Sequence, residues 1–290
     1  MKNIFMAKNP PYQSQHKVSQ VYLKQFGYLN GNQWKVSVLQ VGGKFTQQKS
    51  IKSFLAETNL FDINSEVPEI ERIFEELNSK IENEYLNILN DLDKEQKLSE
   101  KSHAVLIQLI CNFISRSDIW RTRILYLLHT DAKENLLKII CAKWAKSLEE
   151  LEQKEFFQFL LSSNPEIIVN RVLLLFSYYL LQRLAYYEVV ILKSQEKKPW
   201  FTSDNPVLFK NEVGRFEMVK KESEIYLPLN GKYLIYLHNK DSSDKVNKLR
   251  LFETNKVAHA NDDQNWDITQ MLMRNAHNYV IFDCQLIYKI

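Results

Sequence analysis

A polar stretch at residues 202–206 stands between two short apolar runs and carries the carboxylate of Asp204 at its centre. A carboxylate at the end of a strand can act as a general base or bind a catalytic metal ion. Asn205 and Pro206 would fix the turn that presents it. The same residue types also form turns whose only role is structural. The stretch is interpreted either as a catalytic carboxylate that binds a divalent metal such as magnesium or manganese, or as a structural turn.

His16 is a second candidate, far from Asp204 in the sequence and at the expected start of a helix. An imidazole titrates near neutral pH, so it can serve as a general base or as a ligand. It can equally hydrogen-bond to the backbone and hold the first helix in place. Both interpretations stay open from the sequence.

Three arginines lie near the end of an otherwise apolar helical stretch, where the polar run 115–118 interrupts the pattern. A guanidinium can hold a phosphate through two parallel hydrogen bonds. A cation near a helix C-terminus is also favoured by the helix dipole alone. We predict a catalytic set of His16, Arg116, Asp204 and Asn205, with Arg121 and Arg123 contacting the substrate.

Glu75 and Glu82 are seven residues apart in a predicted helix, which places them on one face about two turns apart. Other glutamates flank both positions. We expect these two side chains to face solvent or to pair with lysines.

The chain lacks the motifs of the common enzyme classes. It has no GxSxG, no HExxH, and no glycine-rich loop of the kind that holds phosphates. Asp204 followed by Glu217 and Lys220 approaches the order found in restriction-type nucleases, but the spacing differs by one residue. The sequence therefore leaves the reaction class open.

Cysteine usage and charge narrow the setting. The three cysteines lie far apart without zinc-binding spacing, which favours a reducing compartment, and we expect a cytoplasmic protein. The N-terminus has no apolar signal segment, and the most apolar stretch, 172–192, is interrupted by charged residues, so we expect no membrane span. A net charge of +3 is too small to indicate nucleic-acid binding by itself.

The spacing of apolar residues predicts the elements that must position these side chains. Steps of three and four predict helices over 68–92, 99–129, 132–161 and 165–185, the last apolar on all sides and hence buried. After residue 187 the pattern changes to short alternating runs that are typical of strands, with a final helix inside 255–275. The expected strands are 187–192, 200–202, 207–209, 216–219, 225–229, 233–237, 279–282 and 285–288.

The first sixty residues are mixed. We predict a short helix over 16–26, a strand over 33–41 and a second short helix beginning at Ser50. With 45% hydrophobic and 25% charged residues, the composition is that of an ordinary globular protein. The expected fold is α+β, in one domain of residues 1–290. A helical bundle, about 65–186, packs on a mixed sheet formed mainly by the C-terminal third, about 187–290.

Several short motifs, taken in order, resemble one known family. They are HKVSQVYLKQF after residue 15, FEELNSKIENEYLNIL, NFISRSDIWR, FTSDNPVLF and YLPLNGKYLIYL, followed by the stretch around 275–282. Together they resemble domain-of-unknown-function family 4238 over most of the chain. The resemblance implies that these polar segments recur in one fold, and it implies no activity.

Two functions remain as hypotheses. In the first, the protein is a hydrolase of phosphodiester or similar bonds, such as a metal-dependent nuclease, acting on nucleic acid or a phosphate-bearing small molecule. In the second, it is a non-enzymatic domain that binds protein or nucleic acid, and the same side chains join the bundle to the sheet. Convergence of His16, Arg116 and Asp204 in an open pocket would favour the enzyme.

Overall fold

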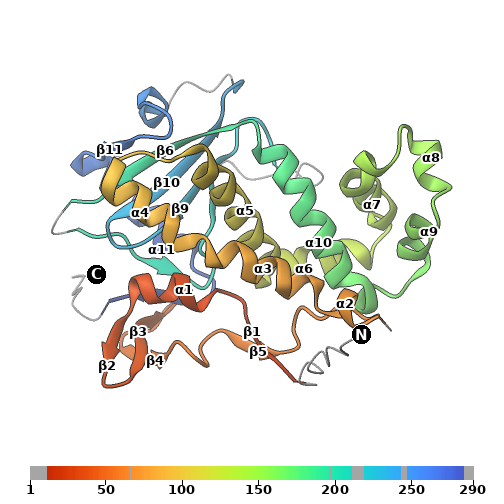
Figure 1. Cartoon of the computed structure of the whole chain (residues 1–290), viewed down its shortest axis with the longest axis horizontal. Helices are drawn as coiled ribbons and strands as arrows, with labels where there is room; N and C mark the ends of the chain where they lie inside the picture. The colour runs from red at the N-terminus through yellow and green to blue at the C-terminus, as the bar shows by residue number, and fades with distance from the viewer. Residues whose placement is uncertain (1–11, 66, 196–197, 211–218, 243–246, 284–290) are drawn as a thin grey trace, which may run out of the picture.

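The computed structural model describes residues 12–65, 67–195, 198–210, 219–242 and 247–283 (Figure 1). About 48% of the chain is helical and 22% is in strands. This composition, with several sheets beside a helical middle, confirms the predicted α+β class.

The helical bundle occupies the middle of the chain, as predicted. It begins with α2 (Pro68–Glu71), α3 (Ile73–Asn83), α4 (Tyr85–Glu95), α5 (Glu100–Arg116) and α6 (Asp118–Leu128). The shorter α7 (Lys133–Cys141), α8 (Leu148–Glu152) and α9 (Glu155–Ser162) lie together at one end, on the right of Figure 1. The long α10 (Pro165–Leu184) packs on α5, α6 and α7.

Three of the predicted long helices are in fact broken into shorter ones. Between α5 and α6 the backbone of Ser117 is extended, and its hydroxyl accepts a hydrogen bond from the Trp120 N–H. The serine therefore caps a new helix instead of continuing the old one. Periodicity alone missed this break because both helices present apolar residues to the same core.

The C-terminal third forms the mixed sheet that was predicted. Its order is β11-β6-β10-β9-β8, with β11 parallel to β6 and the other pairs antiparallel. The strands are β6 (Tyr187–Lys193), β8 (Leu208–Lys210), β9 (Glu224–Pro228), β10 (Tyr233–Asn239) and β11 (Val257–His259). Side chains alternate between two cores, so Ile191 faces the bundle while Val190 and Leu192 pack toward α11 (Asp262–Asn275).

A second sheet joins the two ends of the chain. Its order is β2-β3-β12-β7, with β4 beside β3. The strands are β2 (Tyr28–Asn30), β3 (Gln33–Gln40), β4 (Thr46–Ser50), β7 (Thr202–Ser203) and β12 (Tyr279–Phe282). The helix expected from Ser50 is wrong, because Ser50 ends β4 and turns follow it. The expected strands around 216–219 and 285–288 lie wholly or mostly outside the described residues.

The N-terminal arm, residues 12–26, differs from its prediction at His16. This residue ends the short strand β1 (Ser14–His16), which pairs with β5 (Ala56–Thr58). The helix starts later, at α1 (Gln20–Leu23), where the Ser19 hydroxyl accepts the Tyr22 N–H. Strand pairing therefore fixes the backbone of His16.

One buried core contains residues from both ends of the chain and from the bundle, from Val18 to Ile281. Such a shared core is what we expect of a single domain. Within the described part of the chain, α10 is the one helix long and apolar enough to cross a membrane by those two criteria. Its contacts with α5, α6 and α7 are those of a core helix.

Candidate functional site

Arg116, at the end of α5, lies 2% exposed where the N-terminal arm meets the bundle. Its Nη1 donates to Glu82 Oε1 at 2.6 Å, and its Nη2 donates to the backbone oxygen of His16. The same Nη2 is 3.7 Å from Glu75 Oε2. The guanidinium carbon lies 4.9 Å from the centre of the Phe61 ring. Arg116 thus holds β1 and α3 together through one buried cation.

The structure corrects the expectation for Glu75 and Glu82. Both side chains turn toward Arg116, and they are only 28% and 22% exposed. Burial raises the pKa of Glu82 above its ordinary value, and the charge of Arg116 opposes that shift only in part. The seven-residue spacing does place both side chains on one face of α3, but that face is turned toward Arg116.

Glu82 also opens on a polar pocket of about 310 Å³ between α1 and the α3–α4 region. The pocket brings a carboxyl group of raised pKa together with a lysine, a serine and two amides. Its lining residues are Gln20, Val21, Lys24, Ser79, Glu82, Asn83 and Leu86. Glu82 is therefore a titratable group that reaches both Arg116 and an open cavity.

His16 lies beside Arg116 but has a structural partner of its own. Its Nε2 is 3.1 Å from the backbone oxygen of Lys52, and the residue is 7% exposed. Burial lowers the pKa of His16, and hydrogen bonding to backbone opposes this shift. Burial thus favours the neutral ring, which ties the turn after β4 to the N-terminal arm.

Asp204 occupies a different place, at the turn after β7. Its two carboxylate oxygens accept three consecutive backbone N–H groups, from His277 at 3.0 Å, Asn278 at 2.8 Å and Tyr279 at 3.3 Å. The Asp204 N–H donates to the backbone oxygen of Tyr279 at 3.1 Å. This arrangement fixes the start of β12, which is the structural alternative that the sequence left open.

Asn205 continues this anchor. Its Nδ2 donates to the side-chain oxygen of Asn275 at 3.1 Å. Asn275 in turn donates to the backbone oxygens of Asn205 at 2.7 Å and Val207 at 3.2 Å. The pair of amides joins the end of α11 to the segment between β7 and β8.

The two arginines predicted to bind substrate have intramolecular contacts as well. Arg121 donates to Asn170 Oδ1 at 2.8 Å, and Asn170 holds the backbone oxygens of Leu60 and Asp62. The guanidinium of Arg123 lies 5.2 Å from the centre of the Trp120 ring. A substrate contact for either residue stays a prediction.

The predicted catalytic set is therefore brought together only in part. His16 and Arg116 are in direct contact, with Glu75 and Glu82 added from α3. Asp204 and Asn205 belong to the separate anchor formed with α11 and β12. A single site that contains His16, Arg116 and Asp204 is not what the contacts of these side chains describe.

The donor groups around Asp204 bear on whether it can hold a divalent metal ion. Within residues 12–65, 67–195, 198–210, 219–242 and 247–283, there is no group of three His, Cys, Asp or Glu side chains that could hold a metal ion. Both oxygens of Asp204 are already engaged by backbone N–H groups. Among the described residues, Asp204 is therefore engaged in the turn and is not part of a cluster of three such side chains.

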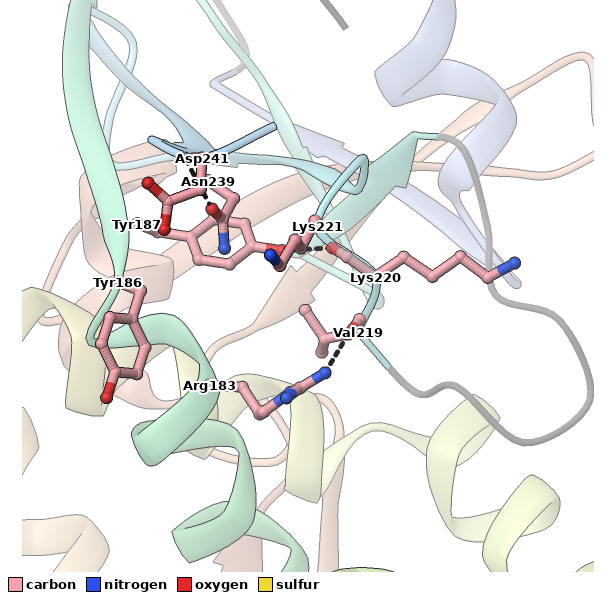
Figure 2. A pocket seen from close by; sticks show the side chains of 8 residues that line it. All are labelled: Arg183, Tyr186, Tyr187, Val219, Lys220, Lys221, Asn239 and Asp241. Carbon is pink, nitrogen blue, oxygen red and sulfur yellow. Dashed lines mark hydrogen bonds between the residues drawn. The ribbon is translucent and has the colours of Figure 1, made fainter. Parts of the chain in front are cut away.

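A second cavity, of about 230 Å³, lies where α10 meets the C-terminal sheet (Figure 2). Arg183 donates to the backbone oxygen of Val219 at 3.3 Å, and the Tyr187 hydroxyl donates to that of Lys220 at 2.6 Å. In Figure 2 the ammonium group of Lys220 points away from Arg183 and Tyr187. These contacts hold residues 219–220 against the sheet.

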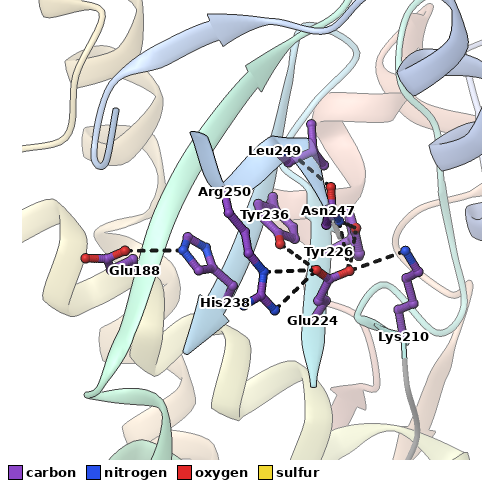
Figure 3. Close-up of polar contacts among 9 residues, drawn as sticks. All are labelled: Glu188, Lys210, Glu224, Tyr226, Tyr236, His238, Asn247, Leu249 and Arg250. Atoms are coloured by element: carbon purple, nitrogen blue, oxygen red, sulfur yellow. Dashed lines mark hydrogen bonds and ion pairs between the residues drawn. The ribbon is translucent and has the colours of Figure 1, made fainter. Parts of the chain in front are cut away.

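Glu224 is the centre of a polar cluster that sequence reasoning missed (Figure 3). It is 1% exposed on β9, and burial alone would raise its pKa. Hydrogen bonds and nearby cations reverse that effect and hold the pKa below its usual range. Its partners are Tyr226 at 3.2 Å, Tyr236 at 2.7 Å, Asn247 at 2.9 Å, and Arg250 and Lys210 at 3.4 Å each.

Beside this cluster, His238 Nε2 lies 3.2 Å from Glu188 Oε2 on the neighbouring strand. The alternation of apolar and polar residues in β9 and β10 was a usable signal, because a charged residue at a core-facing position needs a partner. Because so many donors satisfy Glu224, the cluster fastens residues 247–250 to the sheet and offers no free carboxylate for chemistry.

Comparison with known proteins identifies the family. No curated protein and no solved structure matches the chain. A family model described as "Protein of unknown function (DUF4238)" matches residues 14–285, which is nearly the whole chain. That match includes the Arg116 site, the Asp204 anchor and the Glu224 cluster. The chain belongs to the DUF4238 family.

Proposed function

We propose that this protein is a hydrolase of phosphodiester or similar bonds in which Glu82 moves the proton. One observation carries the proposal: Glu82 lies in a polar pocket, burial raises its pKa, and Arg116 fixes its position. A carboxyl group whose pKa is raised by burial is better suited to general acid–base catalysis than an ordinary one.

The proton path can be stated for a phosphodiester. A water molecule attacks phosphorus while Glu82, as the carboxylate, takes one of its protons. The bond to the leaving oxygen breaks, and Glu82 returns that proton to the leaving oxygen. Arg116 does not touch the substrate in this scheme. It acts as a positioning residue that orients the carboxylate and limits the rise of its pKa.

The pocket supplies groups that suit a phosphate-bearing substrate, whether a small molecule or nucleic acid. Lys24 brings a cation to the lining, and its Nζ lies 5.9 Å from the centre of the Trp34 ring. Gln20 and Asn83 add amides that can donate to phosphate oxygens. This recognition is part of the proposal.

The test compares hydrolysis of bis(p-nitrophenyl) phosphate and of a single-stranded oligonucleotide by wild type and by Glu82→Gln. We expect a loss of about 100-fold or more, since general acid–base catalysis typically contributes 10²–10⁴. Glu76→Gln is the matched control, because Glu76 lies on the exposed face of the same helix. Thermal unfolding of each variant separates a loss of catalysis from a loss of fold.

The same assay measures whether hydrolysis depends on a divalent metal ion. Each protein is measured with EDTA and with added magnesium or manganese, and we expect no requirement for either ion. The acid limb of the activity profile should lie above the ordinary glutamate pKa, because Glu82 must be ionised to accept the proton. Equal rates for wild type and Glu82→Gln would overturn the assignment.

The second candidate is a non-enzymatic binding domain, which the internal contacts of Arg116, Asp204 and Asn205 favour. In that case wild type would cleave neither probe under any of these conditions. It would still bind the oligonucleotide, and Lys24→Ala would weaken the binding.

A further inference from the structure

The opposite side of α3 lines another cavity, of about 220 Å³, between α3, α5 and α10. Its floor is buried, with Phe74 and Cys111 each 1% exposed, while Leu77 and Tyr178 are 41% and 40% exposed at the rim. It is distinct from the Glu82 pocket, because the two share no lining residue.

The lining is apolar and contains no charged side chain. Six of its ten residues are aliphatic or aromatic, and the polar ones are Asn78, Gln108, Ser177 and Cys111. A carboxylate or phosphate at the floor would have no counter-charge among the lining residues and would lose its hydration. The lining therefore selects against ions and favours a neutral molecule.

Asn78 supplies the specific feature of this cavity. The residue is 3% exposed, and its Nδ2 has no hydrogen-bond partner among the residues that the structure describes. A buried amide nitrogen without a partner is unfavourable, and this one is closed to solvent, so a ligand pairs with it only after the amide turns toward the cavity. An amide can also present its oxygen by turning over, so a hydroxyl group would suit it equally.

From these observations we infer that the cavity binds a small neutral ligand with an apolar body and one hydrogen-bonding group directed at Asn78. A cavity of about 150 Å³ lined by apolar side chains is known to hold benzene. A volume of about 220 Å³ therefore suits one aromatic ring with a short substituent, or a short aliphatic chain of similar size. The inference stands independently of the proposed hydrolase.

Three probes of similar size test the inference by calorimetric titration. These are p-cresol, which carries a hydroxyl, toluene, which carries none, and benzoate, which is charged. We expect p-cresol to bind about fivefold more tightly than toluene, the effect of one hydrogen bond. Benzoate should bind far more weakly than either.

Two variants locate the site. Asn78→Leu should abolish the preference for p-cresol over toluene, whereas the exposed Asn90→Leu should leave it unchanged. Ser177→Leu fills the cavity and should abolish binding of both probes. The methyl resonances of Ile81, Leu174 and Leu181 should shift when p-cresol is added to wild type, which tests the location without any variant.

Three results would overturn the inference. The first is that neither p-cresol nor toluene binds wild type at millimolar concentration. The second is that both bind wild type and a correctly folded Ser177→Leu protein alike. The third is that benzoate binds as tightly as p-cresol, which would remove the neutral class. None of these measurements depends on hydrolytic activity, so the hydrolase proposal can fail or succeed separately.

Discussion

Asp204 shows how a single side chain can be saturated by backbone alone. Three successive N–H groups, from residues 277–279, converge on its two oxygens. Hydrogen bonds to an ionised acceptor are stronger than those between neutral groups. The Asp204 carboxylate thereby fixes the backbone of the residues that lead into β12.

This arrangement predicts that Asp204→Asn and Asp204→Ala both lower stability. An asparagine replaces one acceptor oxygen with an NH2 group, which cannot accept from the backbone, so we expect a loss of about 1–2 kcal/mol. Asp204→Ala removes both acceptors and should lose about 2–3 kcal/mol. Urea unfolding measures both, with the exposed Asp267→Asn as the control.

If Asp204→Asn unfolds at the same urea concentration as wild type but loses activity, the catalytic interpretation of this residue is favoured.

The sequence left the roles of Asp204 open for a physical reason. Residue types specify what Asp204 can bind, but its partners lie more than seventy residues away in the chain. Only the packing of α11 and β12 decides between them.

Arg116 works at the scale of elements. Its guanidinium contacts β1 through the backbone of His16, and α3 through Glu75 and Glu82. It also stacks on Phe61, just after β5. Three separate segments of chain therefore contact α5 through one planar group that can donate in several directions.

We expect Arg116→Lys to lower stability by about 2–3 kcal/mol although it keeps the charge. A lysine cannot make the divergent contacts of the guanidinium, and it would leave at least one buried carboxylate poorly paired. Thermal or urea unfolding measures the loss, and Arg274→Lys on the exposed face of α11 is the matched control. Unchanged stability would show that the planar guanidinium of Arg116 is not what joins β1 and α3 to α5.

Sequence patterns predicted the elements better than the joints between them. The α10 helix and the strands β3, β6, β10 and β12 were predicted because each is a local apolar or alternating run, long for α10 and short for the strands. The breaks in the long helices depend on local caps such as Ser117, and the internal face of Glu75 and Glu82 depends on a partner in α5. Neither effect is visible in the period of one segment.

At the scale of the whole molecule, stability should depend on pH through buried histidines. Burial lowers the pKa of His16 and of His238, so the folded state favours their neutral forms. That contribution is fully present above the ordinary histidine pKa of 6.5 and is lost as pH falls through the lowered values. The raised pKa of Glu82 acts in the opposite sense, because the folded state gains from its protonation.

We therefore expect the free energy of unfolding to fall between pH 7 and pH 5, and to fall less in the double variant His16→Gln, His238→Gln. Glu82→Gln should make the fall steeper, since it removes the opposing contribution. Urea unfolding at a series of pH values measures these slopes, with the exposed His259→Gln as the control. A double variant with the wild-type slope would contradict this assignment.

The position of β12 has a consequence for how the protein is made. This strand lies between β3 and β7. The β3 strand, within the first forty residues, can therefore complete its pairing only after β12, within the last dozen, has been synthesised. About 240 residues separate the two strands in the sequence. At a translation rate of roughly 5–20 residues per second, their synthesis takes roughly 12–48 seconds. During that interval β3 has only β2 and β4 as neighbours and keeps an open edge on the ribosome. The growing chain therefore carries this open edge, a site for misassociation, until β12 emerges.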